Sequence, residues 1–423
     1  MSIFELTAVL LTIAALLGFL NARFFKLPTT IGIMLISLGF SLALIILGHF
    51  FPIIETTAET IVGQIDFNET LLNVMLSYLL FAGALHVDLS DLAAQKWVIS
   101  LMATAGVLIS TFLVGSAVYF LLPLFGLGLP YLSCLLFGAL ISPTDPVAVL
   151  GILKKAGVSK SLETKITGES LFNDGIGVVV FLVLLSIATG GHHVDAGHIG
   201  HLFLVEVIGG IAFGAALGLI GYFLLRSVDN YQVEVLITLA LVTGGYSLAS
   251  TLHTSGPLAM VVCGLMIGNH GRALAMSDTT RHHLDLFWEL VDEVLNAILF
   301  ALIGLELLLI EDNFTSGLLE MGLIAIVVVL FARFVAVALP VMILKPFRAF
   351  SPGAIPMLTW GGLRGGISVA LALALPAAAG RETFLVMTYV VVVFSIAVQG
   401  LTLKPFYERL ARAKKTANPE PGT

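Results

Sequence analysis

The sequence predicts an all-α polytopic membrane protein with about thirteen transmembrane helices. Of the 423 residues, 58% are hydrophobic and only 11% are charged, whereas a soluble globular domain carries about 25% charged residues. The apolar residues gather in long stretches that short polar connections separate. A helix needs roughly 20 mostly apolar residues to cross a bilayer, and most of these stretches reach that length.

Thirteen apolar segments follow one another along the chain, and the ninth is the shortest. The residues after the last segment are too few to form a further domain. The predicted segments, in order, are 6–22, 30–51, 70–87, 97–122, 129–153, 166–189, 199–225, 231–252, 255–269, 284–310, 317–344, 352–376 and 382–403.

The lysine and arginine residues test this number of segments. If thirteen segments alternate in direction, 17 of the 20 basic residues fall on one side of the membrane and only Arg381 falls on the other. The remaining two lie inside segments. Basic residues accumulate in cytoplasmic loops. The pattern therefore predicts a cytoplasmic C-terminus and an N-terminus on the outer side.

Segment 5 carries an aspartate between two prolines, in Ser142-Pro143-Thr144-Asp145-Pro146. Proline removes a backbone donor and clashes with the preceding helical turn. Two prolines three residues apart therefore predict an unwound stretch in mid-membrane. Irregular backbone is tolerated at that depth only where it is buried in protein or lines a cavity.

Segment 12 contains a second predicted break, because four glycines surround Arg364 in the stretch 361–366 and glycine weakens a helix interior. Segments 5 and 12 are the middle members of the triplets 4–6 and 11–13, whose first segments cross in opposite directions. Interrupted segments in corresponding places indicate the binding site of a secondary transporter. We expect two inverted repeats whose broken helices cross at the midplane.

Segment 6 presents a polar stripe within an apolar helix. Ser170 and Asp174 lie one turn apart on one face, and Glu169 and Asn173 form the neighbouring stripe. An ionisable group near the bilayer centre costs at least about 2.5–3.5 kcal/mol, so it marks an ion or proton path by default. Asn173 is expected to organise Asp145 and Asp174 by hydrogen bonds rather than to bind an ion directly.

The predicted site offers oxygen ligands, which hard cations such as Na⁺ prefer. Asp174, Asp145, Ser170 and carbonyl groups freed near Thr144 would supply them. Burial disfavours the charged form of a carboxylate. A proton and a cation would then compete for the same group, and that competition alone is enough for exchange.

Two arginines lie inside segments, Arg333 in segment 11 and Arg364 in segment 12. Because unpaired charges at this depth are costly, we expect Glu169 and Arg333 to form a buried ion pair with a structural role. Arg364 is expected to offset the partial negative charge of carbonyl groups in the broken helices.

Three motifs summarise these features: Thr144-Asp145-Pro146, Glu169-Ser170-Leu171-Phe172-Asn173-Asp174-Gly175 and Gly361-Gly362-Leu363-Arg364-Gly365. Together they resemble the monovalent cation:proton antiporter-1 family, to which bacterial NhaP-type antiporters and eukaryotic sodium/proton exchangers belong. The resemblance covers nearly the whole chain. It implies the antiporter fold, with a dimerisation scaffold of residues 1–96 and 199–310, a core ion-transport domain of residues 97–190 and 317–405, and a short cytoplasmic tail of residues 406–423.

The resemblance also implies an activity. One Na⁺, or Li⁺, would be exchanged for one H⁺ while the core moves against the scaffold of a homodimer in a bacterial plasma membrane. Asp174 and Asp145 would carry cation and proton, with Ser170 and Thr144 as further Na⁺ ligands. Exchange would be electroneutral because Asn173 stands where electrogenic relatives carry a second aspartate. Na⁺, H⁺ and membrane lipid are the implied partners, with no cofactor and no nucleic acid.

Two features stand apart from this resemblance. Ala82 occupies a position that is acidic in many members, so ion affinity or pH dependence is expected to differ. Four histidines cluster in the loop after segment 6 and could bind a metal or sense pH, although a solvated loop is the simpler interpretation. They are His192, His193, His198 and His201.

Three alternative functions remain open. A K⁺/H⁺ antiporter of the same family is the main one. An intramembrane aspartyl protease would use two aspartates that share a proton, but it leaves Arg333, Arg364 and the second break unexplained. An ion channel is usually built from rings of carbonyl groups or charges, whereas this chain has one asymmetric site.

Overall fold

The computed structural model describes residues 3–48, 50–51, 53, 60, 62–63, 70–146, 149–151, 153, 158–189, 196–272, 276–310, 314–348, 350 and 353–417. Within these ranges the chain is helical and contains no β-strand, as the sequence predicts. His192 and His193 of the histidine cluster, and the side chains of His198 and His201, lie outside the described residues.

The helices of the first half are α1 (Ile3–Leu20), α2 (Thr29–Gly48), α5 (Leu76–Leu85), α6 (Leu89–Leu101), α7 (Val107–Leu121), α8 (Tyr131–Leu140), α10 (Lys160–Thr189) and α11 (Ala196–Arg226). Those of the second half are α12 (Tyr231–Thr251), α13 (Gly256–Met266), α15 (Asp278–Leu305), α16 (Leu307–Ile310), α17 (Ser316–Leu344), α18 (Ala354–Trp360), α19 (Gly366–Leu373), α20 (Arg381–Phe394) and α21 (Leu401–Ala417). Short π-helical turns join α6 to α7 and α20 to α21.

Nine helical stretches of the described chain are long and apolar enough to cross a membrane. The other four predicted segments correspond to the short helices α5, α8 and α13 and to the pair α18 and α19. Large apolar side chains on the outer faces stay exposed, as on α17, where Phe331 is 62% exposed. Such faces suit a lipid environment and would be unfavourable in water.

Several helices extend beyond the predicted segments. The helix of segment 4 begins at Leu89 rather than at 97, and that of segment 10 begins at Asp278 rather than at 284. Capping side chains explain the difference, because an oxygen of Asp88 accepts from Ser90 N at 2.8 Å and Ser277 Oγ accepts from Thr280 N at 3.4 Å. These caps stabilise polar first turns, which a search for apolar stretches leaves out.

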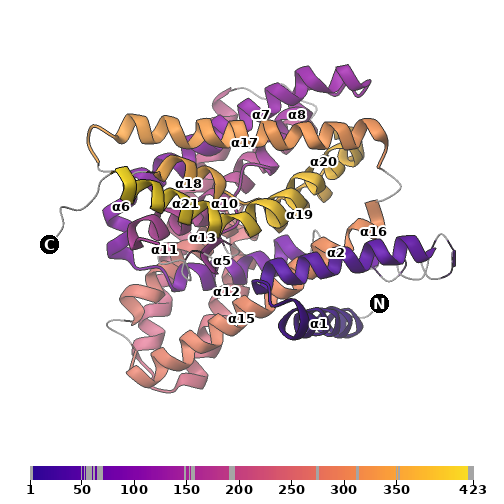
Figure 1. The fold of residues 1–423 in the computed structure, drawn as a ribbon. Helices are drawn as coiled ribbons and strands as arrows, with labels where there is room; N and C mark the ends of the chain where they lie inside the picture. Colours follow the sequence, from indigo (N-terminus) through magenta and orange to yellow (C-terminus); the bar gives the residue numbers. More distant parts are fainter. Residues whose placement is uncertain are drawn as a thin grey trace.

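The helices form two groups (Figure 1). Helices α7, α8, α17 and α20 lie together in the upper part of the view and pack on one another, with α10 beside α6 and α8. Helices α1, α2, α12 and α15 lie in the lower part, where α15 packs on α2 and α5, and α13 packs on α5, α11 and α12. Helix α1 begins and helix α21 ends at opposite ends of the bundle.

Glycine allows the closest helix contacts, as is common where helices pack in membranes. A Cβ atom on Gly138 of α8 would collide with the carbonyl oxygen of Thr111 on α7. Reciprocally, a Cβ atom on Gly115 would lie 2.9 Å from the Cα of Leu135. The backbones of α7 and α8 thus touch directly, which fixes the orientation of α8 just before the chain unwinds.

Candidate ion-binding site

The two predicted breaks are present, and they meet. Helix α8 ends at Leu140, and no helix is formed over residues 141–146. Helix α18 ends at Trp360, and α19 starts only at Gly366. At the crossing, the backbone N–H of Asp145 donates to the carbonyl oxygen of Leu363 at 2.8 Å. Each unwound segment therefore satisfies part of the other's backbone.

The crossing requires a glycine on one side. A Cβ atom on Gly365 would collide with the carboxylate of Asp145 and would lie 2.9 Å from its Cγ. Any larger residue must displace the carboxylate or the backbone. The glycine-rich stretch thus has a steric role beyond weakening the helix.

Asp174 lies on α10 beside this crossing. It is only 6% exposed, and its Oδ1 has no hydrogen-bond partner among the described residues. Asp174, Asp145 and Thr144 all line one cavity of about 900 Å³. A buried acceptor without a protein partner costs free energy unless water or an ion occupies its surroundings, so this cavity offers room for either.

Hydroxyl and amide groups connect the break to α10. Thr144 Oγ1 lies 3.0 Å from Ser170 Oγ. The backbone N–H of Thr144 donates to Asn173 Oδ1 at 3.2 Å, and Asn173 Nδ2 donates to Thr144 Oγ1 at 2.8 Å. We expected Asn173 to organise the two aspartates, but its described hydrogen bonds go to Thr144. The reason is geometric, because the unwound segment presents Thr144 to α10.

Glu169 and Arg333 lie in contact, as the sequence predicts. Both carboxylate oxygens of Glu169 accept from the Arg333 guanidinium, with Nη2 to Oε2 at 2.9 Å. Arg333 Nη2 also donates to the Leu358 carbonyl at 3.0 Å. The pair is buried and does not line the cavity. It joins α10, α17 and the end of α18 instead.

Arg364 reaches from the second break to the first. Its Nη1 donates to the carbonyl oxygens of Ser142 at 2.5 Å and Pro143 at 2.8 Å. These carbonyls end α8 and lack helical partners, so a guanidinium compensates for their partial negative charge as expected. Arg364 is 2% exposed, and its Nε and Nη2 have no partner in the described chain.

The cavity connects the site to one end of the bundle. It reaches the surface at Lys160, whose side chain is 74% exposed. Among the described residues that line it are nine carboxylates and one lysine. Four of the carboxylates, Asp285, Glu289, Asp292 and Glu293, come from α15. An acidic cleft of this kind raises the local concentration of cations.

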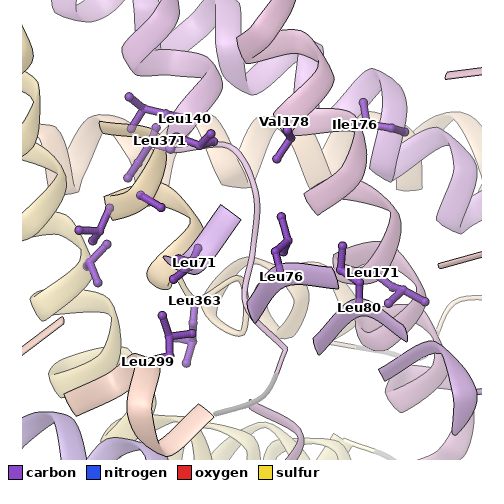
Figure 2. Packing of buried hydrophobic residues seen from close by; sticks show 14 of the residues in the cluster. Leu71, Leu76, Leu80, Leu140, Leu171, Ile176, Val178, Leu299, Leu363 and Leu371 are labelled. Carbon is purple, nitrogen blue, oxygen red and sulfur yellow. The ribbon is translucent and has the colours of Figure 1, made fainter. Parts of the chain in front are cut away.

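Buried apolar side chains lie toward the opposite end of the bundle. Figure 2 shows Leu140, at the end of α8, beside Leu371 of α19. Along α10, Ile176 and Val178 follow Asp174 and lie farther from Lys160, and Figure 2 shows both side chains. All four side chains are buried, whereas the lining of the cavity includes the exposed Lys160 at the other end of α10.

Sequence reasoning missed three contributors to the site. The Leu363 carbonyl is a backbone group, so the residue type gives no indication of its role. Asn296 lines the cavity and donates to the backbone carbonyl of Asp292 at 2.9 Å. Because the two residues are four positions apart, the sequence could have indicated that they share one helix face. Ser368 also lines the cavity, and its buried Oγ has no partner among the described residues.

Comparisons with known proteins agree on one family. A family model described as sodium/hydrogen exchanger, transmembrane, matches residues 9–409. The Na⁺/H⁺ antiporter NhaP of Pseudomonas aeruginosa is 51% identical over 411 residues, covering 96% of both chains. The Na⁺/H⁺ antiporter NhaH of Halobacillus dabanensis is 37% identical over 395 residues, covering 92% of this chain and 93% of that protein.

A solved structure shares the fold. The sodium proton antiporter MjNhaP1 from Methanocaldococcus jannaschii superposes with a TM-score of 0.76 at 20% sequence identity. The match covers 97% of this chain and 99% of the other. The arrangement of helices is therefore shared despite extensive divergence of sequence.

We predict that Glu169→Ala lowers the melting temperature in detergent. Removing one partner of a buried ion pair leaves the other charge uncompensated and costs about 3–5 kcal/mol. Glu408→Ala is the control, because its pair with Arg412 is exposed and such pairs contribute about 0–1 kcal/mol. The double variant Glu169→Leu with Arg333→Leu should recover part of the loss. Equal melting curves for all variants would contradict the stabilising role of the Glu169–Arg333 ion pair.

We predict that Gly365→Ala impairs ion binding, because the added methyl group displaces the Asp145 carboxylate. A misplacement of about 1 Å at a reacting group costs up to about a hundredfold in rate. The measurement is the cation concentration needed for half-maximal exchange in vesicles. Gly39→Ala is the matched control, since its Cβ would meet nothing within 4 Å. Wild-type affinity in Gly365→Ala would show that the close contact is unimportant.

Proposed function

The chain belongs to the sodium/hydrogen exchanger family, and we propose that it exchanges Na⁺ for H⁺ across a membrane at Asp174 and Asp145. The observation that carries the proposal is the buried Oδ1 of Asp174, which lines an acidic cavity and has no hydrogen-bond partner in the described part of the chain. The hydroxyl oxygens of Thr144 and Ser170 lie 3.0 Å apart beside it. This set supplies the carboxylate and hydroxyl oxygens that a hard cation needs.

Competition between cation and proton couples the two fluxes. A bare carboxylate is unfavourable away from water, so Asp174 has to be covered before it leaves the cavity. Na⁺ entering along the acidic cavity displaces the proton and covers the charge. After release on the other side, a proton covers it for the return. In no step does the site move while the negative charge of Asp174 lacks a bound proton or cation. This restriction couples the Na⁺ gradient to the proton gradient.

The charges at the crossing support a one-for-one exchange. Glu169, Asp174 and Asp145 contribute three carboxylates, whereas Arg333 and Arg364 contribute two guanidinium groups. One negative charge remains when all are ionised. A single proton or a single monovalent cation neutralises it, so we propose electroneutral transport. Asn173 adds no charge to this set, and its amide is engaged by Thr144.

Alternating access is proposed to occur between the two groups of helices. The cavity lies between Thr144 and Asp174 of the core and residues of α5 and α15 of the scaffold. Movement of residues 97–190 and 317–405 against residues 1–96 and 199–310 would close it and open the apolar end. The distribution of basic residues supports a cytoplasmic opening of the cavity, and we propose that the described state is inward-facing.

The membrane setting follows from the same reasoning. Bacterial relatives support a bacterial plasma membrane as the location. A homodimer formed through the scaffold would hold that group of helices still while the core moves. The N-terminus would lie outside and the end of helix α21 in the cytoplasm, where its basic residues would meet anionic lipid.

We predict that Asp174→Asn reduces exchange to the level of empty vesicles, because the amide can neither release a proton nor neutralise a cation. Vesicles with an acidic lumen are challenged with Na⁺, and lumenal pH is followed. Asp278→Asn is the control, since the Asp278 side chain is 97% exposed. A folded Asp174→Asn protein that exchanges like wild type would overturn the assignment.

We predict that Na⁺ dissipates the proton gradient and that K⁺ does not, at equal concentrations in the same vesicles. The rate should be unchanged when a K⁺ gradient with an ionophore sets the membrane potential. Activity with K⁺ alone would favour the K⁺/H⁺ alternative. A rate that follows the potential would exclude electroneutral exchange, and conduction without a proton signal would favour a channel.

A further inference from the structure

The second break leaves backbone groups without helical partners. Helix α18 ends at Trp360 and α19 begins at Gly366, so the carbonyl of Trp360 and the N–H of Arg364 lie at the ends of the unwound stretch. Both residues lie within predicted segment 12. A backbone group in a lipid environment needs a protein partner, because the hydrocarbon offers no water to hydrogen-bond it.

Two side chains of the following helix supply these partners. Arg364 N donates to Ser395 Oγ at 2.8 Å, and Gln399 Nε2 donates to the Trp360 carbonyl at 3.0 Å. Ser395 Oγ in turn donates to Gln399 Oε1 at 2.8 Å. Ser395 and Gln399 are fully and almost fully buried. We call this hydrogen-bonded pair the amide clamp.

The helix is shaped to present the clamp. Ser395–Gly400 forms a π-helical turn between α20 and α21. Here the turn places the Ser395 hydroxyl and the Gln399 amide against the two ends of one unwound stretch.

The first break is held in the same manner. Asn173 of α10 accepts from Thr144 N at 3.2 Å and donates to Thr144 Oγ1 at 2.8 Å. Helix α10 follows the first break, as the helix α20–α21 follows the second. In both triplets, therefore, an amide side chain of the third helix holds the unwound backbone of the middle one.

One peptide unit connects the clamp to the ion site. The N–H of Arg364 is bound by Ser395, while the carbonyl of the same peptide, that of Leu363, accepts from Asp145 N at 2.8 Å. Because a peptide unit is planar, fixing its N–H fixes the direction of its carbonyl. Ser395 thus orients the group that positions Asp145, and it sets the start of the Arg364 side chain as well.

We propose that Ser395 and Gln399 are positioning residues for exchange, which act on Asp145 and Arg364 through the Leu363–Arg364 peptide. The proposal rests on the proposed function of this site. It assigns to two uncharged residues of segment 13 a role in cation affinity, although neither side chain lines the cavity.

The test compares Ser395→Ala and Gln399→Met, which remove the polar groups with little change of volume, with Thr402→Ala. Thr402 is the matched control because it lies on α21 and accepts from the indole of the same Trp360 at 3.1 Å, without touching the unwound backbone. Exchange is measured in vesicles over a range of Na⁺ concentrations. Thermal unfolding in detergent is measured for each variant.

We predict that Ser395→Ala and Gln399→Met raise the KM for Na⁺ by roughly tenfold or more, as expected when a binding group is displaced. Thr402→Ala should keep the wild-type KM. Because Ser395 and Gln399 share a hydrogen bond, the double variant should lose less than the product of the single effects. If Gln399→Met fails to fold, Ser395→Ala, which removes one oxygen, decides alone.

A purely structural clamp gives a different result. It lowers the melting temperature and the amount of folded protein, but the KM of the folded fraction stays at the wild-type value. That outcome, or an equal rise of KM in Thr402→Ala, overturns the proposal. If wild-type vesicles show no Na⁺-dependent pH change at all, the proposed function itself has failed, and the clamp is refuted along with it.

Discussion

The backbone hydrogen bond between Asp145 and Leu363 is the contact around which the rest of the protein is arranged. Two segments of the chain can pair their backbones in mid-membrane only if both are unwound there. Unwinding exposes backbone polar groups that lipid cannot satisfy. The surrounding residues meet this requirement one group at a time. Arg364 holds two carbonyls of the first break, and Arg333 holds the end of α18.

The buried charges divide into two sets with different duties. Glu169 and Arg333 satisfy each other in a bidentate contact and are separated from the cavity. Asp174 and Asp145 line the cavity, and Oδ1 of Asp174 has no hydrogen-bond partner among the described residues. A buried acceptor in this state is costly unless water or an ion meets it, which is the property that an ion-binding site needs.

Much of this arrangement could be predicted from residue types. The prolines around Asp145 and the glycines around Arg364 locate the breaks because their backbone effects are local. Charges in an apolar helix must be compensated, which made the contact of Glu169 with Arg333 predictable. The partner of Asn173, and the roles of Ser395 and Gln399, depend on which backbone groups the unwound segments expose. Uncharged polar residues in an apolar helix carry little cost and hence little signal.

The buried aliphatic side chains of Leu140, Leu371, Ile176 and Val178 (Figure 2) have a consequence for energy conservation. Protons travel through proteins along files of water or exchangeable groups. Hydrocarbon side chains offer neither, and a layer of them interrupts any such file. Hydrocarbon at this end thus acts as an insulator in the proposed cycle, in which protons cross with the moving carboxylate. A cell could keep such a protein in its membrane without short-circuiting the gradient that drives it.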